Sequence, residues 1–198
     1  VGSLKKEYKP GDMVITSQYI DRTKGFRKHS FLGEGIVGHV SLAKPICEIM
    51  EQKLRAVASK FDFQTHYNGT YICIEGPYFS TQAESKSYIN AGASIIGMTH
   101  FPEFALAREA GLAYLPCCWV TDYDCWDDSI PHVTVAEVIK VMKNNNLKAF
   151  KLLKELVQLK SELWQGTKAP ESGLKTGLFM PIDLVPKNKL EWLKLLMN

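Results

Sequence analysis

The sequence predicts an α/β fold built around a mostly parallel sheet. Short apolar runs of strand length alternate along the chain with segments whose apolar residues recur at helical spacing. Gly and Pro separate many of these segments. Polar and aromatic side chains follow directly after three of the predicted strands, which is where open α/β sheets bind their ligands. Fold class and candidate site are therefore predicted by the same alternation.

Composition limits the classes of protein to which the chain can belong. Its 198 residues are 45% hydrophobic and 23% charged with a net charge of +3, which is typical of a globular chain with one sizeable core. The sequence contains no basic stripe with interleaved aromatic residues, so nucleic-acid binding is not expected. We find neither an apolar run of membrane-spanning length nor a signal peptide, and membrane association is not expected. Five cysteines, an odd number without a CxxC motif, indicate reduced thiols and a cytoplasmic location.

In the first part of the chain, the pattern predicts two strands, a long loop and a helix. Residues 13–16 form a strand after the turn at Gly11, and residues 17–38 form a long polar loop. His39 ends this loop, and a lone His in such a place is more often structural than catalytic. A helix is predicted over residues 41–61, with Pro45 in its first turn. The next strand covers residues 71–74, and Asn68-Gly69 is interpreted as a turn before it.

The second part begins with two further strands and two short helices. A capping box formed by Thr81 and Glu84 predicts a helix that ends at Gly92. Residues 94–98 form a strand, a helix follows over residues 102–110, and residues 113–120 form the strand before an acidic pair.

The longest helix is predicted to start at a second capping box, Thr134 with Glu137, and to reach about Trp164. Three consecutive asparagines, residues 144–146, weaken its pattern. Residues 166–177 are rich in Pro, Gly, Ser and Lys and predict a linker. Residues 184–197 have a strand-like start and then a short helix.

The acidic pair, Asp122 and Asp124, follows an apolar run of buried-strand character. If strand geometry persists, residues i and i+2 point to the same side. Two like charges side by side raise at least one pKa, and a carboxyl tuned in this way can donate or share a proton with a basic heterocycle. The alternative is a solvated loop with ordinary acids, and the spacing alone does not decide between the two.

Several segments together resemble the trimeric purine nucleoside phosphorylase family, and more narrowly its methylthioadenosine phosphorylases. The matching segments are IEGPYFSTQAES (74–85), GASIIGMT (92–99), PEFALAREAG (102–111) and TDYDCW (121–126), with GSL, PGD and YIDRT nearer the N-terminus. The resemblance covers about residues 1–160. It implies a three-layer α/β/α fold with a mixed, mostly parallel central sheet. Residues 1–165 would form the C-terminal two-thirds of the phosphorylase domain, and residues 166–198 a linker and helical tail of the same domain.

The resemblance implies phosphorolysis of 5′-deoxy-5′-methylthioadenosine to adenine and 5-methylthioribose 1-phosphate. Neither a metal nor an organic cofactor is expected, because inorganic phosphate is a co-substrate. A homotrimer is implied for the complete protein. The alternatives are a purine nucleoside or methylthioinosine phosphorylase of the same family, or an inactive purine-binding fragment. Asp122 favours a 6-amino base, because a carboxylate accepts a hydrogen bond from an amino group and repels a carbonyl.

The resemblance also assigns roles to residues. Asp122 is similar to the catalytic residue at purine N7, and Asp124 to its partner near the 6-amino group. Phe79, Ile96 and Met98 are similar to residues at the base and ribose, and Thr99 and Gly2 to residues at phosphate. Val135, Val138 and Ile139 are similar to residues around the 5′ group. His39 is similar to a residue that reaches the 5′ group in a neighbouring subunit's site. From residue type alone, Phe79, Ile96 and the three aliphatic residues would be interpreted as core. Thr99 would be interpreted as a cap of the helix at Pro102.

One part of the family pattern is not matched. The family's phosphate site also uses a glycine-rich loop, an Arg-His pair and a Thr ahead of the position of Val1, where strands of its sheet also lie. We therefore expect residues 1–198 by themselves to bind purines weakly and to show negligible phosphorolysis.

Overall fold

The computed structural model describes residues 1–130 and 134–197. Its strands form one six-stranded sheet of order β5-β2-β3-β4-β1-β6. The strands are β1 (Gly2–Ser3), β2 (Met13–Arg22), β3 (Thr65–Ile74), β4 (Ile95–Gly97), β5 (Cys118–Trp119) and β6 (Asp122–Tyr123). Three neighbouring pairs, β2–β3, β3–β4 and β1–β6, are parallel, whereas β1–β4 and β2–β5 are antiparallel. The predicted mixed, mostly parallel sheet is confirmed.

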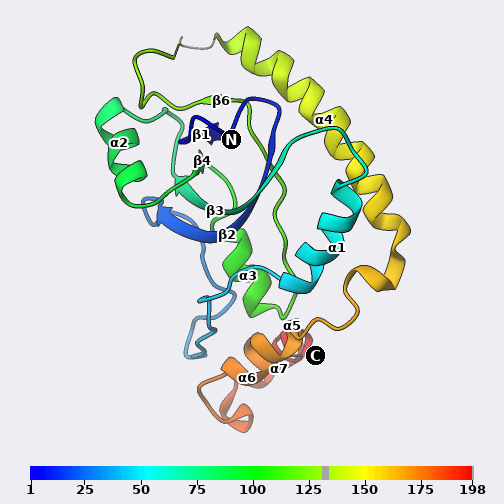
Figure 1. The fold of residues 1–198 in the computed structure, drawn as a ribbon. Helices are drawn as coiled ribbons and strands as arrows, with labels where there is room; N and C mark the ends of the chain where they lie inside the picture. Colours follow the sequence, from blue (N-terminus) through cyan, green and yellow to red (C-terminus); the bar gives the residue numbers. More distant parts are fainter. Residues whose placement is uncertain (131–133, 198) are drawn as a thin grey trace.

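Helices lie on both sides of this sheet (Figure 1). They are α1 (Glu48–Ala58), α2 (Gln82–Asn90), α3 (Glu103–Glu109), α4 (Val135–Gln158), α5 (Ala169–Ser172), α6 (Leu174–Gly177) and α7 (Lys187–Leu196), with 3₁₀ turns η1 (Lys160–Leu163) and η2 (Ile182–Leu184). In Figure 1, α2 lies on one side of the sheet and α1 and α4 lie on the other. Among the described helices, none combines the length and the hydropathy needed to cross a membrane. Both predicted capping boxes are present, at Thr81 for α2 and at Thr134 for α4.

Strand alternation distributes the core side chains. In β3, Tyr71 and Cys73 pack into one hydrophobic cluster, while Ile72 and Ile74 pack into another. A third cluster joins β2 to α1 and α4, with Leu152 among its buried residues. Successive residues of a strand point to opposite faces, so Tyr71 and Cys73 share one face of β3.

Residues 166–197 contain short helices rather than extended linker. Leu174 of α6 and Leu193 of α7 are fully buried, and they cluster with Val185 and with Ile36 from the loop after β2. This part lies at the lower end of the molecule in Figure 1. The strand-like start predicted at residue 184 is wrong, because Ile182–Leu184 form the 3₁₀ turn η2. The division of the chain at residue 165 stays a prediction.

The helix predicted from residue 41 starts later, at Glu48, and Pro45 precedes it. Two features explain the difference. Pro disfavours helical geometry in the residue before it, and the carbonyls of Ser41 and Lys44 accept hydrogen bonds from the guanidinium of Arg108. Those carbonyls therefore have partners outside any helix.

The first two long strands extend beyond their predicted limits. β2 continues to Arg22 because it pairs with β3 along its length, so the long loop starts at Thr23. The interpretation of Asn68-Gly69 as a turn is wrong, because both residues lie inside β3. Asn68 has φ +61°, and the register between β2 and β3 shifts at this point, as at a β-bulge.

Two later expectations also change. Of the run 113–120, strand structure is confined to Cys118–Trp119, and Pro116, which has no N–H to donate, lies just before it. The asparagines of α4 do not interrupt the helix. Asn145 is buried, and its Nδ2 donates to the carbonyl of Val120 at 2.8 Å. Pattern reasoning missed this long-range hydrogen bond.

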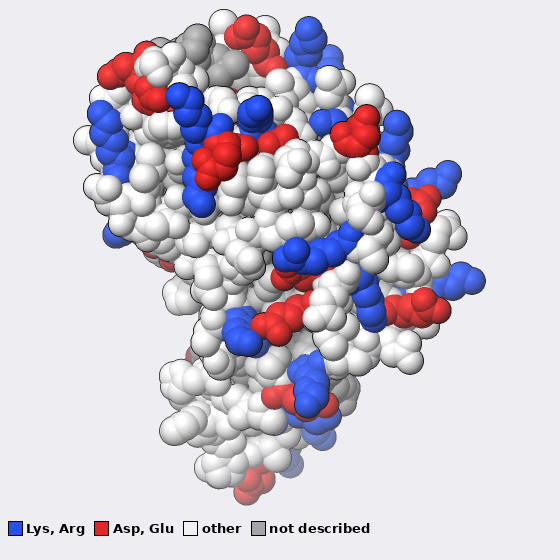
Figure 2. Space-filling model, viewed as in Figure 1, with Lys and Arg blue, Asp and Glu red and all other residues white. Residues whose placement is uncertain are grey.

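Charges are mixed on the surface. On the face shown in Figure 2, Lys and Arg side chains are interspersed with Asp and Glu, and white regions of uncharged residues separate them. The arrangement agrees with the small net charge of +3.

Candidate active site

A cavity of about 630 Å³ lies where β1, β4 and β6 face the start of α4. All of the predicted site residues except His39 line it: Gly2, Phe79, Ile96, Met98, Thr99, Asp122, Asp124, Val135, Val138 and Ile139. The polar residues among them follow β4 or belong to β6 and the residues directly after it, at the predicted edge of the sheet. Within the described residues, we find no group of three or more His, Cys, Asp or Glu side chains that could hold a metal ion.

His39 lies elsewhere, beside the C-terminal helices. Its ring is exposed and meets Phe179 edge-on, with 5.6 Å between the ring centroids. The backbone N–H of His39 donates to the carbonyl of Gly177 at 2.7 Å. His39 therefore does not belong to the cavity of its own chain, and its assignment to a neighbouring subunit's site stays a prediction.

The two acids are held by the strands beside them. Asp122 of β6 pairs in register with Gly2 of β1, and the hydroxyl of Thr121 donates to Asp122 Oδ1. The backbone N–H of Asp124 donates to the carbonyl of Ser3 at 2.9 Å. Oδ2 of Asp124 is buried and has no hydrogen-bond partner in the described part of the chain. Both carboxyls reach the cavity and are half-buried, so they are not freely solvated loop acids.

Close approach at Gly2 keeps the space beside Asp122 open. A Cβ atom at Gly2 would lie 3.0 Å from Cγ2 of Ile96 and 3.7 Å from Oδ2 of Asp122. The first distance is too short for an unstrained contact, so any larger residue would displace Ile96 or narrow the cavity. The sequence reason for glycine here is space rather than backbone conformation.

The environment changes the acidity of both carboxyls. Burial raises the pKa of Asp122, and the hydrogen bond from Thr121 offsets part of this effect. Burial also raises the pKa of Asp124, and the neighbouring charge of Asp122 adds to the increase. Each group therefore keeps its proton to a higher pH than an exposed Asp does. A carboxyl in this state can donate a proton to a basic leaving group.

The apolar wall is cavity surface as well as core. Phe79 is 79% exposed and Val135 is 74% exposed, so interpreting them as plain core is wrong. Ile96 is 5% exposed and belongs to both the core and the cavity wall. Large apolar side chains that remain exposed around one cavity suit an apolar ligand.

Tyr71 is a cavity residue that sequence reasoning missed. Its hydroxyl lies 3.4 Å from Oγ1 of Thr99, and burial raises its pKa, so it stays a neutral phenol. Thr99 does not cap α3, whose N-terminal cap is Pro102 without a side-chain hydrogen bond. Tyr71 lies inside β3 and not after the end of a strand, so the strand pattern carries no signal for it.

Comparison with known proteins identifies the family of this chain. The sequence profile of the Phosphorylase superfamily matches residues 1–158. The chain belongs to this superfamily. The chain is 50% identical over 158 residues to S-methyl-5′-thioadenosine phosphorylase of Hyperthermus butylicus, covering 79% of this chain and 57% of that protein. It thus spans little more than half the length of that relative.

Solved structures agree with this assignment. A methylthioadenosine phosphorylase from an Antarctic soil metagenomic library superposes with a TM-score of 0.91 at 38% identity, covering 100% of this chain and 69% of the other. A mutant adenosine/methylthioadenosine phosphorylase from Schistosoma mansoni, in complex with methylthioadenosine, gives 0.72 at 30% identity, with 99% and 67% covered. The predicted resemblance and the nucleoside-phosphorylase-like fold are confirmed.

Proposed function

We propose that the intact phosphorylase cleaves 5′-deoxy-5′-methylthioadenosine with inorganic phosphate, giving adenine and 5-methylthioribose 1-phosphate. One observation carries the proposal: two half-buried carboxyls of raised pKa share a cavity with exposed aliphatic side chains at the start of α4. The acids suit a basic purine, and the aliphatic residues suit a methylthio group.

The reaction moves one bonding pair and one proton. As a phosphate oxygen bonds to C1′, the C1′–N9 bond breaks and its electron pair goes to the purine. Asp122 gives its proton to N7 of the departing base and becomes a carboxylate, while Asp124 accepts from the 6-amino group. Transfer of a proton to the leaving group in the transition state increases the rate by a factor of about 10²–10⁴.

The other cavity residues place the substrates. Phe79 and Ile96 pack against the base, and Met98 lies under the ribose. Val135, Val138 and Ile139 surround the 5′ substituent. A methylthio group needs no hydrogen bond there, whereas a hydroxyl would lose its hydrogen bonds to water without replacement. The Thr99 hydroxyl donates to phosphate, and the backbone near Gly2 lies beside it.

The names of the relatives support this substrate. The Hyperthermus protein is an S-methyl-5′-thioadenosine phosphorylase, and the Schistosoma structure is a complex with methylthioadenosine. The latter is also called an adenosine phosphorylase, so its base carries a 6-amino group.

We also propose a cytoplasmic homotrimer. The five cysteines are free in the described structure, which suits a reducing compartment. Val37 lies two positions before His39 in the chain, and the Phe179 ring packs against the His39 ring. Both apolar side chains are exposed, and a neighbouring subunit would cover them. Sedimentation equilibrium of the intact protein should give three times the mass of one chain, and a monomer would contradict the trimer.

Release of adenine tests the proposed function. The intact protein is mixed with phosphate and methylthioadenosine, and separately with methylthioinosine and adenosine, and the free bases are quantified. We expect the highest kcat/KM for methylthioadenosine. Preference for methylthioinosine or adenosine would favour another phosphorylase of the superfamily. Purine binding without phosphate-dependent release would show an inactive purine-binding protein.

A further inference from the structure

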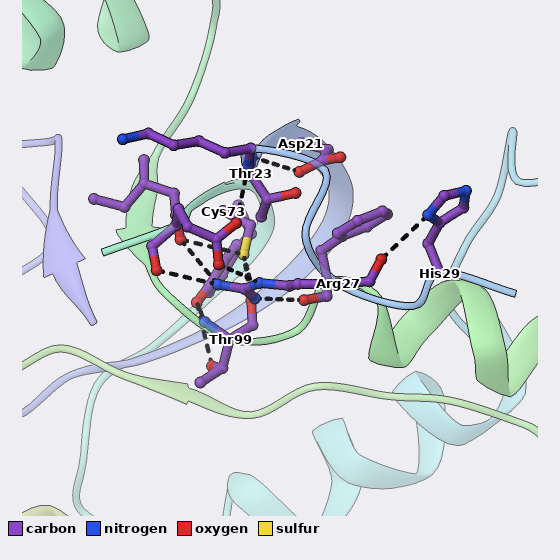
Figure 3. Close-up of polar contacts among 11 residues, drawn as sticks. Asp21, Thr23, Arg27, His29, Cys73 and Thr99 are labelled. Carbon is purple, nitrogen blue, oxygen red and sulfur yellow. Dashed lines mark hydrogen bonds and ion pairs between the residues drawn. The ribbon is translucent and has the colours of Figure 1, made fainter. Parts of the chain in front are cut away.

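Arg27, in the loop after β2, reaches the ends of two other strands (Figure 3). Its Nε donates to Oε1 of Glu75 at 2.9 Å, and its Nη1 donates to the carbonyl of Phe101 at 2.6 Å. Its Nη2 lies 3.4 Å from the carbonyl oxygen of Ile74 and 3.3 Å from that of Glu75. Nη1 also lies 3.7 Å from Sγ of Cys73. A single guanidinium therefore joins the residues after β3 to the residues after β4.

Both of those segments carry cavity residues. The residues after β3 lead through Glu75 to Phe79, and the residues after β4 include Thr99. Cys73 adds a second link, because its Sγ donates to the carbonyl of Thr99 at 2.7 Å. Arg27 does not itself line the cavity, so its influence on the site passes through these segments.

The segment that Arg27 holds is strained. His100 has φ +68°, a conformation that non-glycine residues rarely adopt and that persists when surrounding contacts hold it. The His100 ring offers no anchor through Nδ1, which is buried without a hydrogen-bond partner in the described chain. The bonds to the carbonyls of Thr99 and Phe101 flank His100 on both sides. Arg27 and Cys73 thus hold the backbone at the strained residue.

The Arg27 side chain is itself fixed by a carboxylate. The backbone N–H of Lys24 donates to Oε2 of Glu75 at 2.9 Å while Arg27 occupies Oε1, and the two side chains are 21% (Arg27) and 20% (Glu75) exposed. The Lys24 N–H and then the guanidinium lower the pKa of Glu75, so it stays charged at neutral pH. The planar fork of Arg can serve the carboxylate and the carbonyls together, which the single ammonium of Lys cannot do.

We propose that Arg27 is a positioning residue of the phosphorylase, which fixes the Thr99 hydroxyl at the phosphate end of the cavity. This inference rests on the proposed function. Without the guanidinium, the Thr99–Phe101 segment relaxes and the phosphate donor moves. Phosphate binding is then affected more than nucleoside binding, because Asp122 and Asp124 are held by β1 and not by Arg27.

Steady-state kinetics of the intact protein test the inference. We expect Arg27→Gln to raise KM for phosphate about 10- to 100-fold, the loss typical of a small misplacement, and to change KM for methylthioadenosine far less. Arg27→Lys keeps the positive charge but lacks the planar guanidinium, so its KM for phosphate should remain raised. Lys28→Gln removes the neighbouring, exposed positive charge and is the matched control. Phosphate KM values in both Arg27 variants equal to that of Lys28→Gln would overturn the inference.

A second measurement does not depend on activity. Cys73→Ala removes the donor to Thr99 and Cys73→Ser keeps one, so amide hydrogen exchange at residues 99–101 should be faster in Cys73→Ala and close to wild type in Cys73→Ser. Arg27→Gln should show the same acceleration. Unchanged exchange in Cys73→Ala and Arg27→Gln would overturn the inference. A wild-type protein that releases no adenine would contradict the proposed function instead.

Discussion

Two carboxyls illustrate how local environment creates chemistry. Asp122 and Asp124 are ordinary residues in a TDYDCW segment, and their spacing predicts that both point to one side. The structure adds burial, which raises both pKa values and which spacing could not show. The sequence therefore predicts the identity and the direction of the two acids and a raised pKa for at least one of them, whereas the burial that raises both pKa values depends on long-range packing.

Asp122→Asn should change the pH dependence of stability. Burial raises the folded pKa of Asp122 above its unfolded value of about 3.9. Its contribution to stability is therefore fully present below the unfolded pKa and is lost as pH rises through the folded pKa. The difference in unfolding free energy, variant minus wild type, should grow in urea titrations as the pH rises above about 4. Asp62→Asn, at an exposed position, is the control, and a flat difference for both variants would contradict the raised pKa.

At the scale of elements, α4 has two functions along its length. Its first turns bring Val135, Val138 and Ile139 to the cavity, and its later turns bury Leu152 and Leu156 against β2 and α1. Helical spacing predicts that such a helix exists and where it starts. It does not show which apolar residues are buried, because that depends on partners distant in sequence.

Val135→His should shift substrate preference toward a 5′-hydroxyl nucleoside, because the imidazole can form a hydrogen bond with the hydroxyl. A single group in such a pocket is worth about 1–3 kcal/mol. The measurement is the ratio of kcat/KM for methylthioadenosine to that for adenosine. Val157→His, an exposed position in the last turns of α4, should leave the ratio unchanged. An unchanged ratio in Val135→His would show that this residue does not contact the 5′ group.

Thr134→Ala should destabilise the start of α4. The Thr134 hydroxyl accepts from the N–H of Glu137, and the Glu137 carboxylate accepts from the N–H of Thr134. Loss of such a cap costs about 1 kcal/mol of unfolding free energy. Thr134→Ser keeps the acceptor and should remain close to wild type in the same urea titration. Equal stability of the alanine and serine variants would show that the capping box contributes nothing.

At the scale of the whole molecule, the cavity is assembled from segments far apart in the chain. Met98, Thr99 and Asp124 directly follow strands, and the ends of strands meet at one edge of the sheet, so the strand pattern predicts these positions. Tyr71 and Arg27 escape this reasoning. Tyr71 is interior to a strand. Arg27 contacts Cys73 and Phe101, which lie 46 and 74 positions further along the chain. No local pattern encodes such contacts, so the support of the site becomes visible in three dimensions.

In the proposed reaction, Asp122 supplies the proton for the departing purine. The decisive measurement of this role is adenine release by Asp122→Asn in the intact protein at saturating phosphate and methylthioadenosine. We expect a loss of about 10²–10⁴ in kcat relative to Asp62→Asn, because the amide cannot donate a proton as an acid does. Circular dichroism should show that the variant is folded. Adenine release at the wild-type rate by a folded Asp122→Asn would contradict the account.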